Sequence, residues 1–318
     1  MTGYLIRRAA TALVVLLGVS VFIFLMLHLI FPSPAIDVLG PHANKFSINQ
    51  WNAQHGFDEP WLVQYLRYLN QLLHGNLGYS YKLNQSVAAL FRERWLRSAY
   101  LSGVTLFLSV VIAIPLGIYQ AVRRNTVGDS VVTTGAFVTY AMPDFFLYLI
   151  AIQLFAITIP IFSYEGPQTT SMVSIIFDWR AMTLPIVCLT LLELAGYSRY
   201  MRSSAIDTLA QDYVRLARAK GLSERLVLTR HVLRNSLLAI VTLLGMSVPM
   251  LLTAGLVVEY VFNVPGVGLS YWVAASNADY PVELGVTVIV GAATVLGSLL
   301  ADLSYIALDP RVREAARR

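Results

Sequence analysis

The sequence predicts an all-α integral membrane protein with six transmembrane helices. Of its 318 residues, 57% are hydrophobic and only 13% are charged, and the mean hydropathy is +0.63. A chain of this composition lacks the polar surface that a soluble protein needs, so it requires lipid as its solvent. Six stretches reach the roughly 20 mostly apolar residues that a spanning helix needs. They are 9–30, 98–122, 131–159, 182–200, 237–258 and 284–308.

The first apolar stretch is predicted to remain as a membrane anchor, residues 1–31. Its apolar run is too long for a signal peptide, and Phe31-Pro32-Ser33-Pro34 provides no small-x-small cleavage site. The next segment, 32–97, is predicted to be a small external cap of loop, helix and turn. Apolar and aromatic residues recur there at helical spacing over 64–73, and the glycines of 75–78 end the pattern.

Two carboxylates fall inside predicted spans, where an ionisable group costs several kcal/mol unless it faces protein or water. Asp144 follows Pro143 in the third span. It either caps the helix break at this proline or faces a central cavity, where it would attract the amino group of a peptide. Glu193 lies in the fourth span and either pairs with an arginine such as Arg199 or gives a path negative charge. The sequence leaves these alternatives open.

A polar, arginine-rich segment, 212–235 (DYVRLARAKGLSERLVLTRHVLRN), separates the fourth and fifth spans. The small side chains of Ala217 and Ala219 keep a first helix slim. Gly221 can adopt the left-handed conformation that ends this helix, and Ser223 can cap the next one. The sequence therefore predicts a helix, a sharp turn and a second short helix.

An interrupted stretch, 259–268 (EYVFNVPGVG), follows the fifth span. Pro265, Gly266 and Gly268 prevent a continuous helix, and irregular backbone near a membrane persists only where it is buried in protein or lines water. A gate or path wall satisfies this requirement; a tight surface turn is the alternative. Glu259, and Asp302 near the end of the sixth span, are expected to form structural hydrogen bonds.

Positive charges predict the orientation, because short cytoplasmic loops carry an excess of Lys and Arg. Four basic clusters fall on one side: Arg7 with Arg8, Arg123 with Arg124, eight basic residues within 199–235, and Arg311, Arg313, Arg317 and Arg318. That side is the cytoplasm, so both termini are predicted to be cytoplasmic. Three external arginines belong to a long segment, which is translocated largely regardless of charge. They are Arg92, Arg94 and Arg97.

Four stretches together resemble a known family. They are GFDEPWLVQYLRYLNQLLHGNLGYSY, YVRLARAKGLSE, EYVFNVPGVG and DLSYIALDPR. In them the chain resembles the B-type permease subunits of the dipeptide, oligopeptide and nickel branch of binding-protein-dependent ABC importers. The family's cytoplasmic signature is Glu-Ala-Ala, three residues and Gly. Here Arg215-Leu216-Ala217 stands in place of Glu-Ala-Ala, and the glycine is Gly221.

The resemblance implies a type I ABC importer permease fold of six helices with cytoplasmic termini. It implies an anchor helix (1–31), an external loop with short helices (32–97), a five-helix permease core (98–308) with a coupling loop at 207–235, and a cytoplasmic tail (309–318). The external loop is either a packing element or part of the surface that receives the binding protein.

The resemblance also implies roles for particular residues. The coupling loop would dock on a separate ATPase through Asp212, Tyr213, Arg215, Ala217, Ala219, Gly221, Leu222 and Ser223. The alternative is a basic loop that lies against anionic lipid. The candidate path residues are Asp144 and Glu193, and the candidate external gate is Glu259, Pro265, Gly266 and Gly268.

The partners implied are a homologous second permease, two ATP-binding subunits that hold ATP and magnesium, and an extracytoplasmic substrate-binding protein. Together they would move di- or oligopeptides inward across the bacterial cytoplasmic membrane. No cofactor is expected on this chain. The pI of about 9.3 follows from the basic clusters on the cytoplasmic side and requires no nucleic-acid partner.

Missing motifs exclude several classes of enzyme. Glycine precedes none of the three lysines, Lys45, Lys82 and Lys220, so the chain has no P-loop and cannot hydrolyse ATP itself. H-E-x-x-H and G-x-S-x-G are absent, so no catalytic constellation is predicted. The single cysteine, Cys188, rules out both an internal disulfide and a cysteine metal cluster.

Two other functions stay open. A nickel-chelate permease of the same branch is one, although the external histidines lack the i, i+4 spacing of helical metal ligands; they are His42, His55 and His74. A secondary transporter or channel that works alone is the other, but it should show an inverted repeat and paired broken helices, and neither is apparent.

Overall fold

The computed structural model describes residues 2–30, 33–40, 42–169, 171–247, 251 and 255–308. For residues 2–9, 37 and 301–308 it describes the backbone alone. The predictions for the tail at 309–318, for the Arg7 and Arg8 side chains and for the Asp302 side chain lie outside these described residues. Tail residues Arg311, Arg313, Arg317 and Arg318 are likewise outside them.

The described chain is almost entirely helical, with one two-stranded hairpin. In chain order its elements are α1 (Thr2–Ile30), α2 (Ala35–Leu39), α3 (Lys45–His55), α4 (Trp61–Leu73), β1 (Tyr79–Ser80), β2 (Gln85–Ser86), α5 (Val87–Val122), α6 (Val127–Ala141), α7 (Asp144–Ile152), η1 (Gln153–Thr158), α8 (Met172–Phe177), α9 (Trp179–Leu209), α10 (Asp212–Ala219), α11 (Glu224–Leu226), η2 (Val227–Leu233), α12 (Arg234–Met246), α14 (Leu256–Val261), α15 (Val267–Ser276) and α16 (Tyr280–Leu308). The strands pair antiparallel, Tyr79 opposite Ser86.

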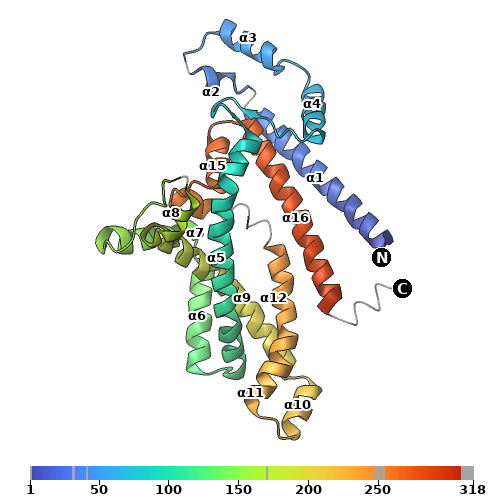
Figure 1. The fold of residues 1–318 in the computed structure, drawn as a ribbon, viewed down its shortest axis with the longest axis vertical. Helices are drawn as coiled ribbons and strands as arrows, with labels where there is room; N and C mark the ends of the chain where they lie inside the picture. Colours follow the sequence, from blue (N-terminus) through green and yellow to red (C-terminus); the bar gives the residue numbers. More distant parts are fainter. Residues whose placement is uncertain are drawn as a thin grey trace.

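The six predicted spans correspond to five long apolar helices and one bent pair of helices. The five are Ala10–Ile30, Val87–Val122, Trp179–Leu209, Glu224–Met246 and Tyr280–Leu300. Figure 1 shows α2, α3 and α4 gathered at one end of the molecule and α10 and α11 at the other, with the long helices between them. The prediction of an all-α membrane protein is confirmed.

The third predicted span, 131–159, is sharply bent, and the helix break expected at Pro143 is present. α6 ends at Ala141, and α7 and η1 leave it at an angle of 101°. Pro143 disfavours the helical conformation of the residue before it, and Met142 is accordingly extended (ψ 134°). As a result α7 lies across the long axis in Figure 1 and does not continue α6.

Two of the observed helices are longer than the predicted spans that they contain. α5 begins at Val87, eleven residues before the predicted start, where the Ser86 hydroxyl caps it by accepting from Ala89 N–H. α9 continues to Leu209, beyond the predicted end at residue 200. Both extensions contain arginines, which lower the hydropathy without opposing helix formation, because arginine is a good helix former. The fifth span differs too, since α12 ends at Met246 and part of 248–254 is not described.

Segment 32–97 contains short helices, as predicted: α4, which covers the expected helix, and also α2 and α3. Its hairpin was not predicted. One face of α4 anchors the segment to the long helices. Gln64 meets the His28 ring of α1 (Oε1–Nε2 3.0 Å), and the Tyr65 hydroxyl lies 2.9 Å from that of Ser20. The hairpin is held by the Ser80 hydroxyl, which donates to Asp279. Burial raises the pKa of this Asp279 carboxyl.

The centre of the fold is the packing of α5 along α9. At Gly117 the two helices approach so closely that an added Cβ would lie 2.6 Å from Met201 Cβ and 2.9 Å from the Arg202 nitrogen. A separate core cluster forms elsewhere along the same two helices from Leu101, Met182, Cys188 and Leu189. It also includes Val258 of α14 and Phe262 of the turn after it. The core of α5 and α9 lies between segments 32–97 and 212–235 (Figure 1).

Candidate functional sites

Segment 212–235 reverses direction at Gly221, as predicted. α10 ends there with Gly221 N–H donating to Arg218 O (2.9 Å) and Leu222 N–H donating to Ala217 O (3.3 Å). Gly221 has φ +78°, and an added Cβ would meet no atom within 4 Å. Glycine is therefore required here for its backbone conformation and not for lack of space.

The second helix of the segment departs from the prediction in two ways. Ser223 occupies the cap position, but its side chain makes no capping hydrogen bond. Instead Arg218 donates to both Glu224 carboxyl oxygens (Nε–Oε2 3.1 Å, NH2–Oε1 2.7 Å) and joins the two helices; this bond raises the pKa of Arg218. The prediction of a separate second short helix is also wrong, because α11, η2 and α12 form one continuous helical stretch that ends at Met246.

The inner face of the segment is packed against the long helices. Val214 and Ala217 are the buried residues of α10. They join a core whose other members are Ala121 of α5, Ala205 of α9, and Val227 and Val232 of η2. Buried apolar contacts of this kind hold the segment firmly against Ala121 of α5 and Ala205 of α9.

The outer face combines apolar and basic side chains. Tyr213, Leu216 and Leu222 are 43%, 56% and 36% exposed. Of the residues predicted to dock, Ala217 is buried, whereas the others are exposed: Asp212, Tyr213, Arg215, Ala219, Gly221, Leu222 and Ser223. An exposed apolar group on a rigid support is typical of a surface that binds a protein.

Asp144 lies at the first position of α7, just beyond the 101° bend. The cap position before it is held by Pro143, which makes no side-chain capping hydrogen bond. Asp144 is exposed, and its charge lies near the positive end of the α7 dipole. The structure therefore leaves Asp144 open to whatever covers this face of the chain.

Glu193 lies inside the chain, in the middle of α9. Both of its carboxyl oxygens are shielded from solvent, and within the described residues neither has a hydrogen-bond partner of ordinary geometry. The suggested pairing with Arg199 is wrong, because the Arg199 guanidinium instead lies over the Tyr140 ring of α6 at 4.5 Å from its centroid. Of the two candidate path carboxylates, only Asp144 is exposed in this chain.

The interrupted stretch after the fifth span forms a buried turn around Glu259. This residue is fully buried, accepts a hydrogen bond from the Ser98 hydroxyl of α5 (2.6 Å) and another from Leu269 N–H (2.9 Å). Ser98 in turn accepts from Val267 N–H (2.9 Å). The carboxylate thus lies at the N-terminus of α15, where backbone N–H groups favour negative charge.

The glycine and proline residues of this turn make different contacts. An added Cβ at Gly266 would collide with the Glu259 carboxyl group. Pro265 O accepts from Arg97 NH1 of α5 (2.9 Å). Gly268 is wrong as a helix breaker, since it is the second residue of α15; its backbone donates to Glu259. Gly266 and Gly268 therefore lie against the Glu259 carboxylate, whereas Pro265 contacts Arg97.

Sequence reasoning missed the α5 side of this site. Arg94 donates to the Ser270 hydroxyl (2.8 Å), and the Arg97 residue is only 4% exposed. These residues were assigned to a solvated external loop. The missed signal is their spacing, because Arg94, Arg97 and Ser98 stand at i, i+3 and i+4 and so share one face of a helix.

Comparison with known proteins places the chain in a family. Residues 113–314 match the family described as binding-protein-dependent transport system inner membrane component, and residues 1–102 match the N-terminal domain of that component. The oligopeptide transport system permease protein AppB of Bacillus subtilis is 33% identical over 314 residues, which cover 98% of this chain and 99% of the relative. The glutathione transport system permease protein GsiC of Salmonella typhi is 32% identical over 313 residues, with the same coverage. The chain therefore belongs to the family of inner-membrane components of binding-protein-dependent transport systems.

Proposed function

We propose that this chain is one half of the pore of an ABC importer that moves peptides inward across the bacterial cytoplasmic membrane. The observation that carries the proposal is the rigid cytoplasmic reversal at Gly221, with its buried inner face and exposed outer face. The cargo class is taken from the named relatives, which are oligopeptide and glutathione permeases.

The partners follow from the task of each surface. The outer face of 212–235 would dock on an ATP-binding subunit, because an exposed apolar and basic surface on a rigid support can receive and transmit force. ATP and magnesium would be held by two such subunits, and this chain would supply no catalytic group. A homologous second permease would complete the pore, and an extracytoplasmic binding protein would deliver the peptide at the opposite end.

Asp144 is the carboxylate that would give the peptide path negative charge. It is exposed at the bend between α6 and α7, where a second permease subunit could enclose it in a shared cavity. Glu193 is enclosed by its own chain, so its contribution to a path would require movement of α9. The turn around Glu259 would serve as the external wall or gate, held to α5 by Ser98 and Arg97.

The alternatives make different predictions for transport. A nickel-chelate permease would carry a metal complex and not a peptide; within the described residues, no three His, Cys, Asp or Glu side chains gather to hold a metal ion. A secondary transporter would work without an ATPase and would draw on an ion gradient. The names of both relatives favour peptide import over either alternative.

Reconstitution in vesicles tests the proposal. The chain, its sister permease and the ATP-binding subunits, together with loaded binding protein, should import peptide only when ATP is present. The Asp144→Asn variant should reduce import of free-amine peptides more than import of N-blocked ones, and Glu193→Gln should not discriminate between them. Uptake that needs an ion gradient but no ATP, or uptake of nickel chelates alone, would overturn the proposal.

A further inference from the structure

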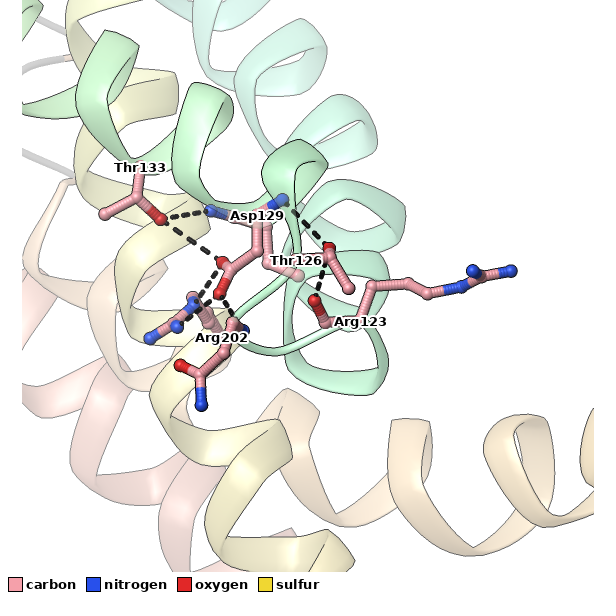
Figure 2. Close-up of polar contacts among 7 residues, drawn as sticks. Arg123, Thr126, Asp129, Thr133 and Arg202 are labelled. Atoms are coloured by element: carbon pink, nitrogen blue, oxygen red, sulfur yellow. Dashed lines mark hydrogen bonds and ion pairs between the residues drawn. The ribbon is translucent and has the colours of Figure 1, made fainter.

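The helix α6 is attached to the rest of the protein in an unusual way. Of its residues, Val127–Ala141, only Asp129 is buried, so its one buried side chain is a carboxylate. A helix in a membrane protein normally packs through small or apolar side chains. Figure 2 shows the Asp129 carboxylate pointing from the start of α6 toward Arg202 of α9.

The two side chains form a bidentate ion pair. Arg202 Nε lies 2.9 Å from Asp129 Oδ1, and Arg202 NH2 lies 2.8 Å from Oδ2. The Asp129 and Arg202 side chains are 5% and 25% exposed. Asp129 also accepts from Asn125 N–H (3.0 Å) and from the Thr133 hydroxyl (3.3 Å), as Figure 2 shows in part. With four donors on two oxygens, the carboxylate is saturated and has no room for a ligand.

One end of this pair is connected to the cytoplasmic segment. Arg202 lies within the last turns of α9, and Ala205, three residues later, belongs to the core that contains Val214 and Ala217 of α10. The same part of α9 is also bound to the start of α12, because Ser204 Oγ donates to Ser236 O (3.2 Å). Displacement of α10 therefore displaces Arg202.

The other end of the pair is connected to the bend. Asp129 stands near the start of α6, which leads directly to Pro143 and the exposed Asp144. Arg199, one turn before Arg202, lies over the Tyr140 ring near the other end of α6. Two arginines of α9 thus contact α6 along its length, and the rest of α6 is only partly buried or exposed.

We propose that Asp129 and Arg202 are positioning residues that make α6 and the bend at Pro143 move together with α9. The inference rests on the proposed function, because it assigns the route by which displacement at 212–235 reaches the candidate path. A bidentate pair is suited to this role, since the planar guanidinium fixes direction as well as distance.

Three variants test the inference. Asp129→Asn and Arg202→Gln each remove one charge, and Arg202→Lys keeps the charge but removes the bidentate geometry. Arg124→Gln is the matched control, because Arg124 is exposed in the same turn between α5 and α6. The complexes would be reconstituted in vesicles and measured for ATPase retention, for ATP hydrolysis stimulated by loaded binding protein, and for peptide imported per ATP hydrolysed.

The positioning role has a distinct signature. Asp129→Asn and Arg202→Gln should lower peptide imported per ATP about fivefold or more, with the ATPase subunits retained, and Arg202→Lys should fall between them and wild type. Arg124→Gln should match wild type. A wild-type ratio in both charge-removing variants would overturn the inference. A loss of import that only matches the loss of ATPase subunits would also overturn it. So would failed assembly of both charge-removing variants, together with a wild-type ratio of peptide imported per ATP in Arg202→Lys. Failure of the wild-type complex to import peptide would instead contradict the proposed function.

Discussion

Two glycines are needed at the candidate sites for different physical reasons. Gly221 adopts a left-handed backbone in open space, whereas Gly266 has an ordinary extended φ but faces the Glu259 carboxyl group. The first requirement concerns the conformation of the chain, and the second concerns the space left for a side chain. Substitutions that separate conformation from space therefore test each site.

At Gly221, we expect Asn to be tolerated and Val to be harmful. Asparagine adopts the left-handed region more readily than other residues, whereas this backbone costs a residue with Cβ about 1–2 kcal/mol, and β-branched valine is among the least suited to it. Gly221→Val should therefore weaken ATPase binding or uncouple it, as measured by ATPase retention and stimulated hydrolysis. Equal behaviour of Gly221→Asn and Gly221→Val would show that the turn conformation does not matter.

At Gly266, the added methyl group of Ala should displace Glu259 from α15. Overpacking of this kind costs about 1–3 kcal/mol, so Gly266→Ala should lower the thermal unfolding temperature of the purified chain. Gly103→Ala is the matched control, because a Cβ there meets no atom within 4 Å and alanine favours helix. An unchanged unfolding temperature in Gly266→Ala would contradict the described turn.

Among the elements, the bent pair of α6 and α7 separates this structure most clearly from a simple bundle of straight spans. Hydropathy depends on the number of apolar residues in a window and not on the direction of the chain. It therefore predicts one span over 131–159, although Pro143 indicates a break within it. The sequence did predict the reversal at Gly221 and the helix α4, because glycine and helical periodicity are local signals.

The bend can be measured as a distance between spin labels. Labels on Val131→Cys and Leu149→Cys, both exposed positions, would be about 27 Å apart along a straight helix. The 101° angle between α6 and α7 predicts a clearly shorter distance. Double electron–electron resonance on the Cys188→Ala protein would decide between the two, and a separation near the straight-helix value would exclude the bend.

Long-range pairings were beyond the sequence for a related reason. Arg97 with Pro265, Asp129 with Arg202 and Ser98 with Glu259 join residues more than seventy positions apart, and no local pattern specifies such partners. The charged residues in the extensions of α5 and α9 lower the local hydropathy, so these extensions were not predicted as parts of spans, although Arg97 is buried and Arg202 pairs with Asp129. The fold class and the cytoplasmic turn were predictable from local sequence, whereas the partners of buried charges required the packed structure.

For the whole molecule, the fold places segments 32–97 and 212–235 at opposite ends of one core. Figure 1 shows α3 at one end and α10 at the other. The core of α5 and α9 links them, with the turn around Glu259 bound to one part of α5 and the cytoplasmic segment packed against another. This arrangement suits a chain that receives cargo at one end and force at the other.

The most direct test of this account is to locate the two ends of the chain in an assembled complex. In the Cys188→Ala protein, Asn49→Cys should react with a membrane-impermeant thiol reagent applied from outside. Leu216→Cys and Ser223→Cys should be protected from it and should form cross-links with the ATP-binding subunit, because the exposed face of 212–235 is the proposed docking surface. Reaction of Leu216→Cys from outside, or failure of both cytoplasmic variants to capture the ATP-binding subunit, would contradict the account.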